Sequence, residues 1–340
     1  MRHSLGGDCD SRFYYICFMI SVSILVLKNG VLASISDSRY VFTMVNEFLK
    51  KSGRPALFNV QLVSLWKEVK LNNGLYSIHA DAMINDVKQT DLIIIPSMTG
   101  DMFSSSYLNK DYVVWIAQQY KGGAEVASLC VGAFLLAYSG LLKDKQCTTH
   151  WLYANEFRVL YPSVKLVDEK IITDQNGLYS SGGGNSYWNL LLYLIEKYAG
   201  RPMAIHAAKY FVIDLDRHNQ SPFVVFSGLK DHEDEEIKSA QEYIEKHFRN
   251  KLTIDKIAAK FNLTRRTFER RFKKATYITV AEYIQRVKIE AAKKQLEMGR
   301  KSITEVMVDV GYSDTQTFRD VFKRITDMTP VDYRKKYNKL

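Results

Sequence analysis

The C-terminal third of the sequence contains two copies of one helical pattern. In the second copy, apolar residues recur at helical spacing over residues 303–310, and Gly311 follows where a helix commonly ends in a left-handed residue. After this turn, Phe318 and Phe322 lie one helical turn apart, so the next helix has an apolar side and a polar side. Two short amphipathic helices joined this closely predict a helix-turn-helix.

The first copy of the pattern lies 49 residues earlier in its first helix and 50 residues earlier in its second. Apolar residues recur over residues 254–261, and Phe268 and Phe272 repeat the aromatic pair. Ser302, with Glu305 three residues later, predicts a capping box at the start of the second copy. The second helix of such a unit can enter the major groove of DNA, so two units predict a DNA-binding domain, here called the reader, that contacts two DNA segments.

The run GYSDTQTFRDVFKRITDMTPVDYRKKY resembles the C-terminal signature of AraC/XylS-type transcription regulators, and the resemblance extends over residues 235–340. In that family a long central helix, here expected over residues 280–297, holds two helix-turn-helix units so that both recognition helices face one side of the DNA. Carried over by position, the resemblance implies that the residues facing the bases are Arg266, Thr267, Glu269 and Arg270 in the first unit, and Thr315, Gln316, Arg319 and Asp320 in the second. Lys273 and Lys323 complete the predicted DNA-contacting set.

Within this set, Lys273 and Lys323 are expected to face phosphates. Asp320 suits a phosphate-facing surface least, because a carboxylate and a phosphate repel each other. Two roles are open for it: it accepts a hydrogen bond from a cytosine amino group, or it orients Arg319.

The charge distribution supports a DNA-binding C-terminal domain independently of the motif. Residues 235–340 contain 25 Lys and Arg against 15 Asp and Glu, whereas residues 1–234 contain 22 of each. The whole net charge of +10 therefore lies in the predicted reader. A basic surface of this kind attracts the phosphate backbone with little regard to base sequence.

An apolar run at residues 14–27 follows Arg2 and Arg12 and has the outline of a secretory signal. Fourteen residues are too few to span a bilayer, and no clear small-residue cleavage site follows. The favoured interpretation is a short disordered lead over residues 1–21 in a cytoplasmic protein, with a strand at residues 22–27. A membrane-anchored regulator, and an overlong choice of start codon for the first fifteen or so residues, are the alternatives.

Strand and helix signals alternate over residues 22–211, which predicts a flavodoxin-like layered α/β domain. The clearest signal is the run DLIIIP at residues 91–96, which is expected to be a central strand buried on both faces. Expected strands cover residues 22–27, 58–64, 76–84, 91–96 and 124–129, and expected helices cover residues 40–50, 109–120, 187–198 and 203–211.

The segment SLCVGA at residues 128–133 places Cys130 at a sharp turn between a strand and a helix, which is the layout of a nucleophile elbow. The partial positive charge of a helix N-terminus favours the thiolate form of a cysteine there. His150 follows twenty residues later, and the fold could bring it back toward Cys130. A glycine-rich corner at residues 180–185, which includes Gly183, can offer backbone N–H groups to an anionic or carbonyl ligand.

Together, CVGAFLLAYSGLLKDKQCTTHW and SSGGGNS resemble the PfpI-type, class I glutamine-amidotransferase-like domain that precedes the AraC-type module in GlxA-type regulators. The resemblance covers roughly residues 22–217. Enzymes of that superfamily use the elbow cysteine with a histidine, and often with an acid from the loop after the first strand. Here that loop is expected at residues 29–36 and contains no acid, while Asp37 stands at its far edge. Covalent catalysis therefore lacks part of its machinery.

Three interpretations of Cys130 remain open. In the first, Cys130, His150 and Gly183 line a ligand pocket inherited from an enzyme. In the second, Cys130 is a small residue tolerated at a tight turn. In the third, the chain is a working amidase or aldehyde-processing enzyme that uses Cys130. His150, which precedes Trp151 at an expected helix start, could also simply cap that helix.

No cofactor and no metal site are expected. Cys147 and His150 have a C-x-x-H spacing, but the sequence has no second pair to complete a metal site. Cys9 and Cys17 show no disulfide framework, which agrees with a reducing compartment.

The sequence thus predicts a lead at residues 1–21, a PfpI-like sensing and dimerisation domain at 22–213, a flexible linker at 214–234, and an AraC-type domain at 235–340. The acidic run DHEDEE at the end of the linker is interpreted as N-terminal charge for a helix that starts near Asp234. The expected function is a sequence-specific, DNA-binding transcription regulator rather than an enzyme. Double-stranded DNA, a small-molecule effector and a second copy of the chain are the expected partners, no membrane is expected, and RNA polymerase is kept open.

Overall fold

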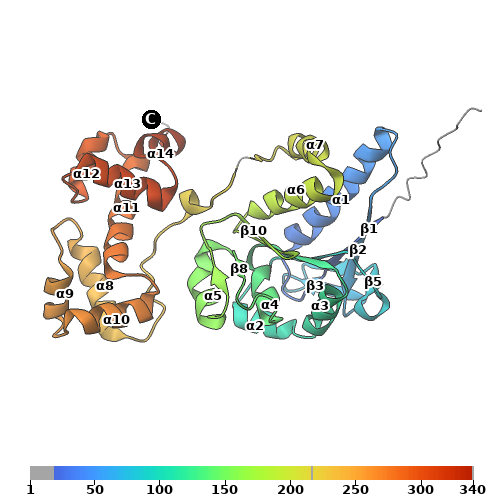
Figure 1. Cartoon of the computed structure of the whole chain (residues 1–340), viewed down its shortest axis with the longest axis horizontal. Helices are drawn as coiled ribbons and strands as arrows, with labels where there is room; N and C mark the ends of the chain where they lie inside the picture. Colours follow the sequence, from blue (N-terminus) through green and yellow to red (C-terminus); the bar gives the residue numbers. More distant parts are fainter. Residues whose placement is uncertain (1–18, 216, 339–340) are drawn as a thin grey trace, which may run out of the picture.

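The computed structural model describes residues 19–215 and 217–338 of the chain, and the predicted lead lies mostly outside them. In the described part, the N-terminal half is built on a seven-stranded sheet with strand order β10-β11-β7-β6-β1-β2-β5 (Figure 1). All neighbours in this sheet are parallel except β10 and β11. The strands are β1 Ile20–Leu25, β2 Phe58–Ser64, β5 Ala82–Met83, β6 Leu92–Ile95, β7 Glu125–Ser128, β10 Ile172–Gln175 and β11 Leu178–Ser181.

Two smaller pairs of strands accompany the sheet. An antiparallel pair joins β3 Glu68–Leu71 to β4 Tyr76–His79, and a short parallel pair joins β8 Gln146–Cys147 to β9 Lys165–Leu166. The β8–β9 pair brings the segment before His150 next to the loop that begins at residue 167. This loop contains Asp168, whose carbonyl accepts a hydrogen bond from Gln220.

Helices cover both faces of the sheet, because successive residues of a strand point to opposite sides. Ile94 lies in one buried cluster and its neighbours Ile93 and Ile95 lie in the other. The first face is covered by α1 Leu32–Lys51, α6 Ser186–Ala199 and α7 Arg201–Phe211, and the second by α2 Met102–Leu108, α3 Tyr112–Lys121, α4 Ala133–Tyr138 and α5 Ala154–Leu160 (Figure 1).

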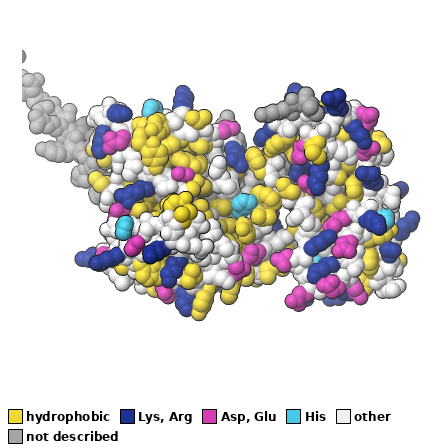
Figure 2. Space-filling view, turned by 180° about the vertical axis from the view of Figure 1, so that it is seen from behind, with side chains coloured by type: hydrophobic (Ala, Val, Ile, Leu, Met, Phe, Trp, Pro, Cys, Tyr) yellow, Lys and Arg dark blue, Asp and Glu magenta, His cyan; other side chains and the backbone are white. Residues whose placement is uncertain are grey.

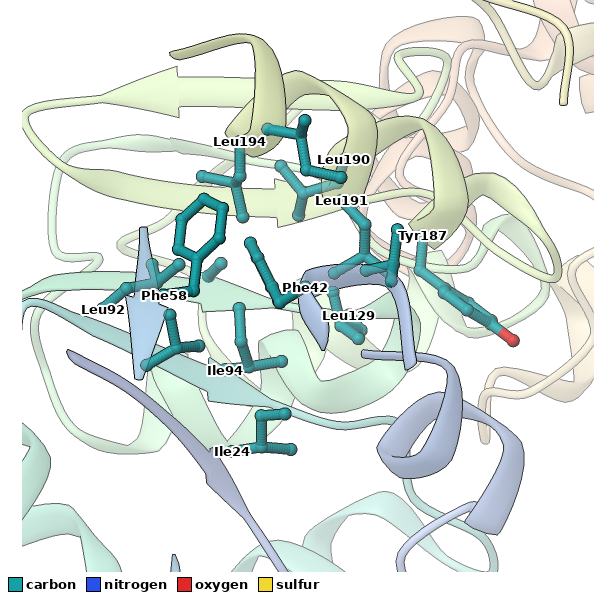
Figure 3. Close-up of a cluster of buried hydrophobic side chains, with 14 of the residues drawn as sticks. Ile24, Phe42, Phe58, Leu92, Ile94, Leu129, Tyr187, Leu190, Leu191 and Leu194 are labelled. Carbon is teal, nitrogen blue, oxygen red and sulfur yellow. The ribbon is translucent and has the colours of Figure 1, made fainter. Parts of the chain in front are cut away.

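The first of these clusters fixes α1 and α6 against the strands. Figure 3 shows Phe42 of α1 and Leu190 and Leu191 of α6 converging on Ile24 and Ile94. Each fully buried side chain of this size contributes about 1.5–3 kcal/mol relative to an exposed one. This packing holds the ends of β7 and β11, where the candidate site lies, in one rigid frame.

Most predicted elements are present, with several corrections. The helix predicted from residue 40 begins at Leu32, so residues that were assigned to the loop after the first strand are helical. The first strand begins at residue 20 rather than 22. The segment at 76–84 is divided between β4, β5 and a short 3-10 turn. The helix predicted from residue 109 begins at Tyr112, and α2, which lies before it, was not predicted at all.

The C-terminal half consists of helices arranged around two separate cores. One core contains Phe268 and Phe272, and the other contains Phe318 and Phe322. The long helix α11 joins them, since Val287 belongs to the first core and Ile289 to the second. The helices are α8 Glu235–His247, α9 Ile254–Lys260, α10 Arg265–Thr276, α11 Val280–Met298, α12 Ile303–Asp309, α13 Thr315–Thr326 and α14 Pro330–Tyr337.

Side-chain caps explain why these short helices begin where they do. Every helix from α8 to α14 starts at an Asp, Ser or Thr whose side chain accepts a hydrogen bond from a backbone N–H of the first turn. The predicted capping box of Ser302 and Glu305 is present, and Asp234 caps α8 as expected for the end of the acidic run. Within the residues described, no helix has the length and apolar character needed to cross a bilayer.

The two helix-turn-helix turns offer a test of the packing. Gly311 and Asn262 occupy equivalent positions and both have a positive φ, of 78° and 54°. A Cβ at Gly311 would lie 2.4 Å from the carbonyl oxygen of Arg249. We expect Gly311→Asn to lower the free energy of unfolding by about 1–3 kcal/mol through this overlap, although asparagine tolerates the backbone angle.

Asn262→Gly is the matched control and should change the free energy of unfolding by less than about 1 kcal/mol. Denaturant unfolding followed by circular dichroism measures both variants. Equal effects of the two substitutions would contradict the assigned contact with Arg249.

Candidate functional site

The recognition helices α10 and α13 are held by their apolar sides. Phe268, Phe272, Phe318 and Phe322 are all fully buried. Each pair lies one helical turn apart, so the remaining sides of both helices face outward. The sequence pattern that predicted an apolar side and a polar side therefore matches the packing.

The predicted DNA-contacting residues lie on these outward sides. Thr267 and Glu269 are half-buried: Thr264 donates a hydrogen bond to the hydroxyl of Thr267 at 2.9 Å, and Glu269 pairs with Arg265 at 3.4 Å. The other predicted residues are exposed, namely Arg266, Arg270, Lys273, Thr315, Gln316, Arg319, Asp320 and Lys323.

Intramolecular ion pairs separate some cations of the recognition helices from others. Arg265 pairs with Asp255 and Glu269, and Arg271 pairs with Asp234 and Glu236. By contrast, the cations predicted to contact DNA make no side-chain hydrogen bond or ion pair with any other described residue; these are Arg266, Arg270, Lys273, Arg319 and Lys323. Their charges are available to an external anion.

The contact between Arg271 and Asp234 ties α10 to the start of α8. Arg271 donates two hydrogen bonds to the Asp234 carboxylate, at 2.6 and 3.0 Å. These bonds hold the pKa of Asp234 below its usual range. The final acid of the linker therefore serves as a helix cap and as a clamp on the first recognition helix.

Asp320 has a different partner from the one that the sequence suggested. Gln316 donates a hydrogen bond from its side-chain amide to the Asp320 carboxylate at 2.9 Å. Asp320 thus orients Gln316, and no ion pair joins it to Arg319 among the described residues. The two side chains are one helical turn apart on the same side of α13.

The length of α11 sets the separation of the two units. With 19 residues it extends for about 28 Å at the usual rise of an α-helix. Successive turns of a DNA major groove are about 34 Å apart. The two recognition helices therefore lie at the ends of a rigid helix whose length is close to the spacing of the major-groove turns.

On the side of the molecule that Figure 2 shows, acidic and basic side chains are interspersed over the C-terminal half.

The predicted strand-to-helix turn at Cys130 is present and strained. Cys130 has a φ of 56°, a left-handed value that costs a non-glycine residue about 1–2 kcal/mol. Its backbone N–H donates to Ser181 Oγ at 2.9 Å, and its carbonyl accepts from Thr149 Oγ1 at 3.1 Å. These bonds hold the turn against β11 and against the segment that precedes His150.

The thiol of Cys130 does not have the ionisation that the helix N-terminus predicted. Its side chain is 7% exposed, and burial raises its pKa, although Ser97 and the backbone N–H of Gly184 act in the opposite direction. The thiol rather than the thiolate is therefore favoured. Removal from water is the largest cause of this shift and opposes the effect expected from the helix N-terminus. Cys147 is fully buried as well, and burial raises its pKa to about 12.

His150 lies against the glycine-rich corner. A Cβ on Gly183 would overlap the His150 ring at 2.4 Å, so only glycine allows the ring to lie there. His150 Nδ1 accepts a hydrogen bond from the backbone N–H of Leu152, which matches the capping role weighed from the sequence. Burial lowers the pKa of His150 and favours its neutral form.

Asp37 has a partner of its own in the structure. It lies within α1, and its carboxylate accepts a hydrogen bond from the hydroxyl of Tyr187 at 2.7 Å. The expected loop at residues 29–36 is largely helical, and its sequence contains no acid. Within the residues described, no group of three or more His, Cys, Asp and Glu side chains could hold a metal ion.

Sequence reasoning missed Gln220. This residue was assigned to the flexible linker, yet it is 1% exposed. Gly183 donates its backbone N–H to Gln220 Oε1 at 3.0 Å, and Gln220 Nε2 donates to the carbonyl oxygens of Thr149 at 2.9 Å and Asp168 at 2.6 Å. No local pattern around residue 220 marks a buried amide, because all of its partners are distant in sequence.

A cavity of about 510 Å³ lies between the two halves of the molecule. It is lined by residues after His150, by residues 221–231 and by parts of α11 and α13. Of the described residues, those that line it do not include Cys130, His150 or Gly183. The candidate pocket and this cavity are therefore separate features, although they share the segment that follows His150.

Two protein families match the chain, one in each half. The DJ-1/PfpI family matches residues 35–197, and the Helix-turn-helix domain family matches residues 257–336. This order confirms the predicted α/β domain followed by a helix-turn-helix domain.

Individual relatives match the chain over different lengths. The HTH-type transcriptional regulator GbdR of Pseudomonas aeruginosa is 25% identical over 319 residues, which cover 92% of this chain and 84% of GbdR. Regulatory protein SoxS of Salmonella typhimurium is 35% identical over 98 residues, which cover 29% of this chain and 92% of SoxS.

Among solved structures, a protein of Vibrio parahaemolyticus, provisionally described as a transcriptional regulator, has a TM-score of 0.51 and 22% identity. It covers 56% of this chain and 98% of its own, and it shows the fold of the α/β half. With two exposed recognition helices on buried anchors and with matches in both halves, the chain belongs to the AraC-type, DNA-binding transcription regulators that carry a DJ-1/PfpI domain before their helix-turn-helix units.

Proposed function

We propose that this chain is a sequence-specific regulator whose α/β domain, residues 22–213, senses a small molecule and whose helical domain, residues 235–340, reads an operator. The observation that carries the proposal is the pair of exposed, cation-bearing faces on α10 and α13, joined by α11. Arg266, Arg270, Gln316 and Arg319 are assigned to bases, together with Thr267, Glu269, Thr315 and Asp320. Lys273 and Lys323 are assigned to phosphates.

The proposed effector site contains Cys130, His150 and Gly183. Three features support it: the strained backbone at Cys130, the contact between His150 and Gly183, and the hydrogen bonds that tie the Cys130 backbone to Ser181 and Thr149. A buried thiol with a raised pKa is a poor nucleophile, which favours sensing over covalent turnover. A homodimer, contact with RNA polymerase and a cytoplasmic location complete the proposal.

Electrophoretic retardation on genomic fragments tests the function as a whole. The purified chain should retard a small set of promoter fragments at moderate salt and leave random DNA free. Equal retardation of all fragments, or of none, would refute sequence-specific binding.

Base-facing and phosphate-facing substitutions should behave differently. We expect Arg266→Ala, Arg270→Ala, Gln316→Ala and Arg319→Ala each to weaken binding to a good operator by about 1–3 kcal/mol and to relax preference at particular bases. Lys273→Ala and Lys323→Ala should weaken binding to all sequences alike and flatten its salt dependence. Titration of operator and of single-base operator variants at several salt concentrations measures both effects.

Arg265→Ala is the matched control, because the Arg265 guanidinium is already paired with Asp255 and Glu269. It should change operator affinity less than Arg266→Ala does. A larger effect of Arg265→Ala, or uniform loss in every variant, would mean that the recognition faces are misassigned.

The ionisation of Cys130 predicts slow alkylation. Because burial raises the pKa of this thiol, its thiolate fraction at neutral pH is smaller than that of a free cysteine, and its reaction with iodoacetamide should accelerate only as the pH rises above the ordinary cysteine range. Mass spectrometry of the peptide that contains Cys130, across a pH series, measures the rate. Rapid labelling at pH 7 would instead favour a catalytic thiolate.

Substitution at Cys130 separates sensing from a purely structural role. Cys130→Ser keeps a small polar side chain, so the fold and operator binding without effector should remain nearly intact. The response to a metabolite that raises the melting temperature of the unmodified chain should change, because Cys130 can influence DNA only through an equilibrium that the ligand biases. Operator affinity with and without that metabolite is the measurement, and an unchanged response would leave only the structural role.

A further inference from the structure

The segment at residues 218–226, here called the strap, is anchored at both of its ends. At its start, Ile171 donates its N–H to the carbonyl of His218 at 3.3 Å, and Gln220 donates its backbone N–H to the carbonyl of Glu169 at 2.9 Å. The buried Gln220 side chain adds its bonds to Gly183, Thr149 and Asp168. The strap therefore belongs to the α/β domain up to residue 220.

Two residues later the strap is attached to the helical domain. The hydroxyl of Tyr337 donates to the carbonyl of Pro222 at 3.4 Å, and Lys336 lies over the Phe223 ring at 4.8 Å. Lys293, which is 4% exposed, donates to the carbonyl of Val224 at 2.5 Å.

The end of the strap is held in the same way. The backbone N–H of Phe226 donates to the carboxylate of Glu290 at 3.2 Å, and Glu290 also pairs with Lys293 at 2.8 Å. These partners lie on α11, the helix that carries both recognition units. Two extended residues span at most about 7 Å, so the strap has little slack to absorb a movement of Gln220.

The surroundings of the Gln220 side chain form a mould for a primary carboxamide. The mould offers one donor, the N–H of Gly183, and two close acceptors, the carbonyl oxygens of Thr149 and Asp168. A primary amide has the complementary set, namely one acceptor oxygen and two N–H donors. A carboxylate lacks the donors and a ketone lacks them too, and leaving these buried carbonyl and N–H groups unsatisfied is costly.

The mould is continuous with the proposed effector site through residues 181–183. Ser181 accepts a hydrogen bond from the backbone N–H of Cys130 at 2.9 Å, Gly182 packs against the Gln220 carboxamide, and Gly183 bonds to that carboxamide and touches His150. A ligand beside Cys130 and His150 therefore meets the same backbone that holds Gln220.

We propose that Gln220 is an internal occupant of a carboxamide-binding subsite, and that an effector with a primary amide group replaces it and releases the strap from the α/β domain. The release frees α11 and both recognition units from that domain. This inference rests on the proposed sensing role of the pocket and adds to it the chemical class of the ligand and the route to the reader.

Chemical rescue of Gln220→Ala tests the mould directly. Alanine keeps the Cβ of glutamine, so the part removed corresponds to acetamide. We expect chymotrypsin to cut the full-length Gln220→Ala chain after Phe223 and Phe226 at least tenfold faster than it cuts the unmodified chain. Acetamide at high millimolar concentration should restore protection to Gln220→Ala, and acetone and acetate, of similar size, should not. In the unmodified chain, acetamide should accelerate cleavage, because it competes with the Gln220 side chain.

Further variants keep this test decisive. Gln220→Glu, which faces the carbonyls of Thr149 and Asp168 with a carboxylate, should also expose the strap. His218→Ala, which alters an exposed strap side chain, should leave cleavage unchanged. Far-UV circular dichroism excludes general unfolding, and mass spectrometry identifies the sites cut.

Cleavage of Gln220→Ala at the rate of the unmodified chain, or equal protection by acetone and acetamide, would overturn the inference. Retardation of promoter fragments by the unmodified chain distinguishes a failure of the proposed function from a failure of the inference about Gln220. If promoter binding is specific while protection is independent of Gln220, the inference falls and the proposed function stands. If promoter binding is absent, the proposed function falls whatever the strap does.

Discussion

The burial of two phenylalanine pairs against α11 is the constraint on which the DNA-binding half depends. Phe268 and Phe272 at one end, and Phe318 and Phe322 at the other, are removed from water completely. The polar sides of α10 and α13 must then face solvent, and the single helix between the two cores fixes their separation. The charges are secondary to this packing: they decide what the exposed faces attract, but the aromatic anchors decide where those faces are.

The α/β half retains the backbone of an enzyme elbow without its ionisation. The left-handed Cys130 is a strained residue that the surrounding hydrogen bonds maintain, and strain of this kind is typical of functional turns. Yet the sulfur is buried, burial lowers the pKa of His150, whose Nδ1 caps a helix, and Asp37 is bonded to Tyr187. These features suit the recognition of a neutral polar ligand better than the formation of a covalent intermediate.

The strap gives the two halves a physical connection that a flexible linker would not. Its anchors on opposite sides are only two residues apart, so a change in the hold on Gln220 reaches α11 without passing through a long chain of side chains. Lys293 and Glu290 form a nearly buried pair at that contact, and both accept or donate a bond to the strap backbone. Separating this nearly buried ion pair from the strap backbone would cost free energy, because its polar atoms would lose hydrogen bonds away from water. The strap is therefore expected to be either attached to α11 or released from it, without intermediate positions.

Features that depend on neighbours along the chain could be predicted from the sequence. Helical periodicity with capping residues located both helix-turn-helix units, the apolar run at residues 91–96 located the central strand, and the cysteine among small residues located the elbow. The start of α1 at Leu32 was misplaced because Val31 makes no side-chain cap. The helix α2 was missed, although Asp101 caps it, because it is only seven residues long.

The ionisation and the hydrogen-bond partners of the groups at the site could not be predicted from the sequence. The ionisation of Cys130, the partner of Asp320 and the division of α10 cations into paired and available ones all depend on three-dimensional neighbours and on removal from water. Gln220 is the clearest case, since its bonds to Gly183, Thr149 and Asp168 join residues 37 to 71 positions apart. A local pattern carries no information about a partner at that distance, because burial and hydrogen bonding arise only when the sheet and its loops have assembled.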